Sequence, residues 1–174
     1  MHLSSAVRFA IATLVATPLT ACERAESPEP PLEGAWSIVS IRVTGPDSAA
    51  TTLQPNLFLF TDRHYSMMRV TGNQPRTLAA KDSVTDAEKL AAYDSFIANS
   101  GTYEVTDSTL TTHPIVARSP NFMSGGSDKY TFRLSGDTLW LANTGADLRT
   151  MIGGQLVAPS GPPSATQLVL VRQK

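Results

Sequence analysis

The feature that most constrains this chain is a series of short apolar segments separated by turn residues across residues 35–172. The segments are rich in branched and aromatic residues and are shorter than most helices, which favours strands. Eight of them are expected as strands: 35–43, 56–60, 64–70, 101–105, 109–118, 129–134, 138–143 and 166–172. Short polar connections at 61–63, 106–108 and 135–137 predict hairpin turns between consecutive strands.

Eight strands in hairpin order predict a mainly β fold, a single eight-stranded antiparallel up-and-down barrel. The length of 174 residues fits one such domain. A barrel of this size encloses either one small ligand or a packing of its own side chains. A two-sheet sandwich is the competing architecture.

One helix is expected between the third and fourth strands. Thr85 and Glu88 have the spacing of a capping box, in which each side chain satisfies a free backbone amide of the other residue. Leu90, Tyr93 and Ile97 follow at helical spacing, and Gly101 is placed to end the helix. We expect this helix to pack on the barrel or to close one end, with partner binding as the alternative.

The N-terminal segment has the pattern of a secreted bacterial lipoprotein. Arg8 precedes an apolar run at 9–19 that is too short to span a bilayer. The next residues, Leu-Thr-Ala-Cys at 19–22, resemble the lipobox, which is cleaved before the Cys. Cys22 would then carry acyl chains, palmitate among them, that hold the protein on a membrane. Since Cys22 is the only cysteine, no intrachain disulfide is available, and an ordinary buried Cys is the alternative.

These features divide the chain into a lipoprotein signal peptide at 1–21, a lipidated disordered tether at 22–33 and a barrel domain at 34–174. The tether is rich in Pro and Glu and cannot bury a core. Glu23 stands where an inner-membrane retention signal usually has Asp. We therefore expect a lipoprotein of the bacterial outer membrane that faces the periplasm, with secretion or the inner membrane as alternatives.

Charge and motifs argue against several other functions. The chain has 14 basic and 15 acidic residues and no basic stripe, so a nucleic-acid partner is not expected. After cleavage only His64 and His113 remain, too isolated to form a metal site, and no nucleophile elbow is present. Asp62, Asp107 and Asp137 occupy predicted turns. We expect no catalytic residues, no metal and no cofactor.

Several motifs, taken in order, resemble a known family. Gly34-Ala35-Trp36 resembles the Gly-x-Trp that opens lipocalin barrels, and Arg172 occupies the last strand, where lipocalins place an Arg over that Trp. Residues 34–172 are more specifically similar to bacterial lipocalin-like domain proteins, through segments 59–70, 100–105, 119–125 and 134–141 and through the helix placed before the fourth strand. In lipocalins proper the main helix follows the last strand. The resemblance implies a barrel closed by Trp36 and Arg172, with a cavity for a small ligand.

The function expected from this resemblance is binding of a small apolar or amphipathic ligand by a membrane-anchored barrel. The candidate lining residues are Trp36, Tyr65, Met67, Arg69, His113, Phe122 and Trp140. Arg69 would meet an anionic head group if its strand face points inward and would be a solvated charge otherwise. His113 is either a buried, hydrogen-bonded histidine or a ligand contact.

The alternative function is an envelope interaction or maintenance protein with a solid barrel and a protein partner. Residues 147–165 are expected to form a long irregular insertion, either a lid or a loose loop.

Overall fold

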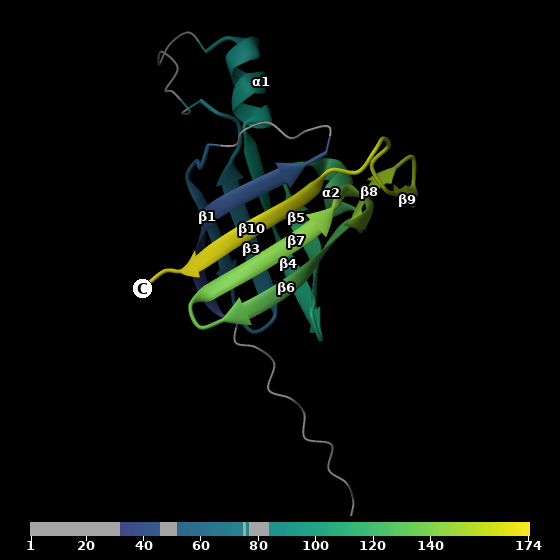
Figure 1. The fold of residues 1–174 in the computed structure, drawn as a ribbon. Helices are drawn as coiled ribbons and strands as arrows, with labels where there is room; N and C mark the ends of the chain where they lie inside the picture. The colour runs from purple at the N-terminus through teal and green to yellow at the C-terminus, as the bar shows by residue number, and fades with distance from the viewer. Residues whose placement is uncertain (1–31, 46–51, 75, 77–83) are drawn as a thin grey trace, which may run out of the picture.

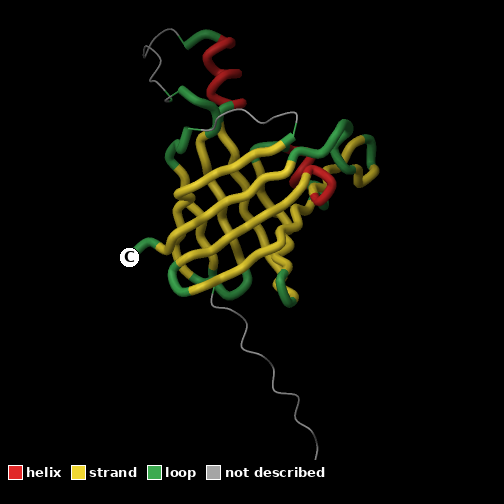
Figure 2. The backbone as a smooth tube through the Cα atoms, viewed as in Figure 1, coloured by secondary structure: helices red, strands yellow, loops and turns green. Residues whose placement is uncertain are grey.

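The computed structural model describes residues 32–45, 52–74, 76 and 84–174, and its main feature is one closed barrel (Figures 1 and 2). Its strands are β1 (Gly34–Thr44), β2 (Asn56–Phe60), β3 (His64–Val70), β4 (Phe96–Thr106), β5 (Thr109–Ala117), β6 (Ser127–Ser135), β7 (Thr138–Thr144) and β10 (Ala165–Arg172). Each pairs antiparallel with the next, and β10 pairs with both β7 and β1. The predicted eight-stranded up-and-down barrel is confirmed. Cys22, the signal peptide and nearly all of the tether lie outside the described residues.

The remaining elements are α1 (Asp86–Asp94), α2 (Pro120–Met123), the 3-10 turn η1 (Gly145–Asp147), β8 (Leu148–Ile152) and β9 (Gln155–Val157). Helix α1 lies between β3 and β4, as predicted. The expectation that 147–165 is irregular is wrong, because β8 and β9 form a hairpin there and β8 pairs with the start of β6. None of the described helices has the length and apolar character needed to cross a membrane.

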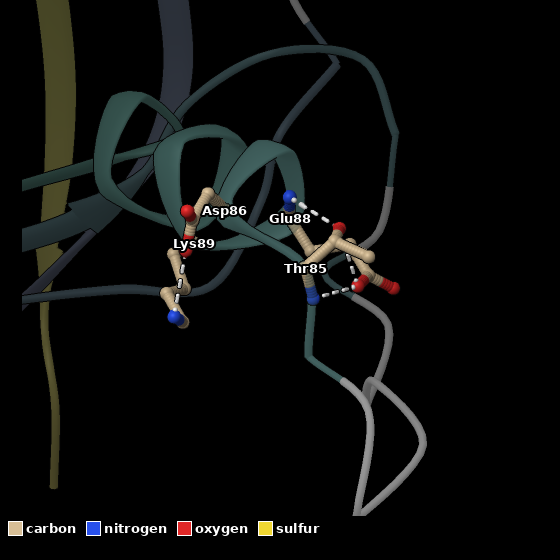
Figure 3. A network of polar contacts seen from close by, with 4 residues as sticks. All are labelled: Thr85, Asp86, Glu88 and Lys89. Atoms are coloured by element: carbon tan, nitrogen blue, oxygen red, sulfur yellow. Dashed lines mark hydrogen bonds and ion pairs between the residues drawn. The ribbon is translucent and has the colours of Figure 1, made fainter.

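The start of α1 matches the prediction, whereas its end does not. Thr85 accepts a hydrogen bond from the Glu88 amide, and the Thr85 amide donates to the Glu88 carboxylate at 2.7 Å (Figure 3). The helix stops at Asp94 instead of near Gly101, because Ile97 and Gly101 belong to β4 and pair with β3.

Helix α1 projects beyond one end of the barrel (Figure 1). None of its residues is buried, and Leu90 is 61% exposed. The expectation that an apolar face of the helix packs on the barrel is therefore wrong. The helix does contact the residue that follows β5, since the Tyr93 hydroxyl donates to the Arg118 carbonyl oxygen at 3.2 Å.

The apolar core fills the end of the barrel at which β1 begins, here called the closed end. Trp36 is fully buried there, and its indole Nε1 donates to the Leu32 carbonyl oxygen at 2.8 Å. The Arg172 guanidinium carbon lies 4.2 Å from the centre of the Trp36 ring, and the same side chain pairs with Asp137 at 3.4 Å. A cation over an aromatic face stabilises the contact, so these residues cover the closed end.

A β-bulge in β1 decides which of its residues face inward. The register with β10 shifts between Ile38 and Ser40, which places one extra residue, Val39, in the strand. Trp36 and Ile38 point inward before the bulge, and Ile41 packs against the core after it. Strict alternation of side chains along a strand would place Ile41 on the opposite face from Trp36. The bulge therefore brings Ile41 to the same face as Trp36 and Ile38, whereas Val39 stays exposed.

Candidate ligand cavity at the open end of the barrel

A cavity of about 300 Å³ lies inside the barrel, at the end opposite Trp36. Its walls come from the ends of β3, β5 and β7 and from the starts of β4, β6 and β10, which meet at this open end. Helix α2 contributes Phe122, and β8 contributes Leu148 and Thr150. In Figure 1, α2 and β8 lie at the end where β7 finishes. The insertion that precedes β10 therefore forms part of the cavity rim.

Arg69 supplies the positive charge of the cavity. Its inward direction follows from β3, where Tyr65 and Met67 are buried and every second residue shares their face. Burial lowers the pKa of Arg69, and the neighbouring Tyr130 acts in the opposite direction. Within the part of the chain that the structure describes, no hydrogen bond or ion pair engages the guanidinium. An arginine keeps its charge at neutral pH, so the cavity contains a cation without a fixed partner.

Asp128, at the start of β6, supplies a carboxyl group that is held by two neighbours. Asn143 Nδ2 donates to Asp128 Oδ1 at 2.8 Å, and the Tyr130 hydroxyl donates to Oδ2. Burial raises the pKa of Asp128, the two hydrogen bonds act against this rise, and the negative charge of Asp147 adds to it. Each carboxyl oxygen therefore has a donor, as a buried acceptor requires.

Two tyrosines lie around this carboxyl group. Burial raises the pKa of Tyr130 well above its ordinary value, and the nearby Asp128 reinforces the effect. Burial also raises the pKa of Tyr65 to about 12. Tyr65 Oη is buried without a hydrogen-bond partner among the described residues. The nearby Thr112 hydroxyl donates to the Asp128 carbonyl oxygen at 3.3 Å.

The structure brings only part of the predicted site together. Met67, Arg69 and Phe122 line the cavity, and Tyr65 lies one inward position deeper than Met67. Trp36 lies at the closed end, where it contacts Arg172.

His113 and Trp140 are corrections to the predicted lining, because both face outward. Their neighbours Thr112 and Leu139 are buried and take the inward positions. His113 Nε2 lies 3.9 Å from a Glu104 carboxylate oxygen, and Arg133 covers the Trp140 ring at 3.5 Å.

Sequence reasoning missed all polar residues of the cavity except Arg69: Asn99, Thr112, Arg118, Ser119, Asp128, Tyr130, Asn143, Thr150 and Thr166. A usable signal was present, because Leu139, Leu141 and Asn143 alternate along one strand face. A polar residue that continues an inward apolar series is a candidate for a buried polar site. Among the described residues, no cluster of three or more His, Cys, Asp or Glu side chains could hold a metal ion.

A closed up-and-down barrel of eight strands with a cavity at one end is the architecture of the lipocalin class. The chain belongs to the lipocalin-like domain family, whose model matches residues 33–155. The predicted family is therefore confirmed. A solved structure of an uncharacterized protein from Bacteroides eggerthii is similar at 11% identity and a TM-score of 0.39, covering 81% of this chain and 98% of that one. No curated protein matches the chain.

Proposed function

We propose that this protein binds a small, partly apolar molecule in the cavity at the open end. The observation that carries the proposal is the space of about 300 Å³ inside an otherwise packed barrel. Protein interiors contain few voids larger than a water molecule, and ligand pockets begin at about 300 Å³. The size supports a compact ligand instead of a long-chain lipid.

The chemistry of the walls supports the same proposal. Apolar side chains from five elements face the cavity: Met67, Ile97, Phe122, Leu148 and Leu168. A few polar groups, Arg69, Asp128 and Asn143 among them, share the space. Apolar walls with a small number of placed polar groups are typical of ligand sites, in which the polar groups orient the bound molecule.

Membrane attachment through Cys22 is part of the proposal. The described chain begins at Leu32, which contacts Trp36 at the closed end. An anchor before this point would leave the cavity on the side of the barrel away from the attachment, where small molecules in the periplasm would reach it. Incorporation of labelled palmitate that is lost in Cys22→Ser would support the anchor, and labelling that persists in this variant would refute it.

A protein partner is the second candidate function. Exposed apolar side chains near the open end favour it: Ile115, Val116, Met123, Ile152 and Leu156. The solid barrel that this alternative assumed does not match the cavity at the open end. Crosslinking in the cell envelope that captures one specific protein through this face would favour the second candidate.

The test of the proposed function is a variant that fills the cavity. Ala117 lines it from the end of β5, so Ala117→Trp should occupy the binding space. In a thermal-shift screen of small carboxylates, alcohols and aromatic metabolites, at least one compound should raise the melting temperature of the wild type and not that of Ala117→Trp. Val116→Trp is the matched control, because Val116 is 60% exposed on the outer face. Equal responses of all three proteins would refute binding in the cavity.

A further inference from the structure

We infer that the ligand is a small monocarboxylate whose carboxylate is bound by Arg69, with the Asn99 side chain as a second donor. The inference rests on the proposed function and gives it a ligand class. Its starting point is that, among the described residues, the Arg69 guanidinium faces the cavity without a protein acceptor. A partly buried cation without an acceptor loses hydration and regains little, which favours an anion supplied from outside.

Asn99 lies on the inner face next to Arg69. Met67 pairs with Asn99, and Arg69 pairs with Ile97, so Arg69 and Asn99 are diagonal neighbours across β3 and β4. Diagonal positions on one sheet face are within reach of a long side chain. Within the described part of the chain, the Asn99 side chain makes no hydrogen bond. Its amide can therefore donate to the same anion as the guanidinium.

The other side chains of the cavity that carry nitrogen donors, and the Tyr130 hydroxyl, already have protein acceptors. Asn143 and Tyr130 both donate to Asp128. The Arg118 guanidinium donates to the Tyr93 carbonyl oxygen, and its carbon lies 4.4 Å from the Tyr93 ring centre. The hydroxyl groups of Ser119, Thr150 and Thr166 also line the cavity. Among the described lining residues, Arg69 and Asn99 are thus the nitrogen-bearing side chains left without a protein acceptor.

The balance of charge favours a monoanion. The charged groups of the described lining are the guanidinium groups of Arg69 and Arg118 and the carboxyl group of Asp128. With Asp128 ionised they leave one net positive charge, which neutralises one negative charge of a ligand. A phosphate dianion would remain half-neutralised in a partly buried space, which is costly. A carboxylate also matches the planar fork of an arginine with two parallel hydrogen bonds. The apolar part of the ligand would lie against Ile97, Phe122 and Leu148.

Three probes with the same apolar chain test this inference: octanoate, octan-1-ol and octyl phosphate. Calorimetric titrations use the full chain with Cys22→Ser, which removes the acyl chains that would compete for the cavity. Octanoate should bind most tightly. Arg69→Met, which keeps the length of the side chain, should weaken octanoate binding about tenfold or more and leave octan-1-ol binding unchanged. Arg133→Met is the matched control, because Arg133 lies outside the barrel on Trp140.

Stability gives a second readout, since Arg69→Met removes a partly buried charge and should not lower the melting temperature. If that variant fails to fold, Arg69→Lys keeps the charge without the fork and should retain only weak octanoate binding.

Equal binding of octanoate and octan-1-ol, or tightest binding of octyl phosphate, would overturn the carboxylate inference and leave cavity binding intact. Absence of binding by all three probes, together with equal thermal-shift responses of the wild type and Ala117→Trp, would overturn the carboxylate inference and the proposed binding in the cavity.

Discussion

At the scale of single residues, the cavity depends on polar side chains that continue inward apolar series. Asp128 precedes the inward residues Tyr130 and Phe132 on β6, and its carboxyl group is desolvated at the rim of the core. Its two donors fix the carboxyl group in place. A desolvated carboxyl group with a raised pKa makes the stability of the fold sensitive to pH.

Replacement of Asp128 by Asn should remove one component of that pH dependence. Since the folded-state pKa of Asp128 is raised, the folded chain binds the proton of this carboxyl group more tightly than the unfolded chain does. This contribution to stability is present below the ordinary Asp pKa of about 3.9 and is lost as the pH rises through the folded-state pKa. Urea unfolding across this interval should show the loss in the wild type and not in Asp128→Asn. Asp62→Asn, at an exposed turn, should keep the wild-type profile.

If the difference in the free energy of unfolding between the wild type and Asp128→Asn did not change with pH, the assignment of a desolvated carboxyl group to Asp128 would be wrong. Glu88, whose pKa is lowered by its hydrogen bonds with Thr85, contributes the opposite slope in both proteins and cancels in this difference.

At the scale of elements, the close approach of β4 and β5 depends on a glycine. Gly101 pairs with Pro114 beside a register shift between Ser100 and Gly101. A Cβ on residue 101 would overlap the His113 carbonyl oxygen and lie 2.8 Å from the Pro114 Cα. Both atoms belong to the backbone and cannot turn away. Only glycine therefore allows the two strands to pair in this register.

Gly101→Ala should accordingly lower the free energy of unfolding by about 2–3 kcal/mol, because overpacked sites relax only by moving the backbone. Chemical denaturation followed by tryptophan fluorescence measures the change. Gly145→Ala is the control: its Cβ would lie 3.7 Å from the Pro163 Cα, an ordinary contact. Equal stability of the two variants would contradict the tight pairing of β4 and β5.

Elements with local signals were predictable from the sequence. The bounds of β2 and β3 match the predicted segments because a polar turn separates two apolar runs. The cap of α1 was also predictable, since Thr85 and Glu88 are close in sequence. The end of α1 was not, because the helical spacing of Ile97 competes with pairing to Arg69 on β3. Tertiary pairing overrides local periodicity there.

The candidate site was less predictable than the fold, because its residues depend on the inward or outward direction of each strand position. One step of register decides whether His113 or Thr112 enters the barrel. The turn residues in the sequence indicate where the strands begin. They do not indicate which face of a strand points into the barrel. Arg69 and Met67 were found because they alternate with Tyr65 inside a predicted strand, whereas Asn99 and Asp128 lie just before the predicted strands 101–105 and 129–134.

At the scale of the whole molecule, the barrel interior is divided between two chemistries. The closed end is filled with apolar side chains around Trp36 and Phe58 and covered by Arg172. The open end holds the cavity, with Arg69 and Asp128 on its inner wall. This division gives the fold a stabilising half and a half with room for a ligand. The same strands form the walls of both halves, as the backbone trace in Figure 2 shows.

The most direct test of the account is to map the position of a bound ligand along the barrel axis. Amide NMR spectra of the Cys22→Ser chain would be recorded during a titration with octanoate or with the best compound from the thermal-shift screen. We predict saturable shifts at Arg69, Asn99 and Asn143 around the open end, with the closed-end Leu170 unaffected. Shifts confined to outward residues such as Val116, or no saturable shifts with any compound that binds, would contradict the account.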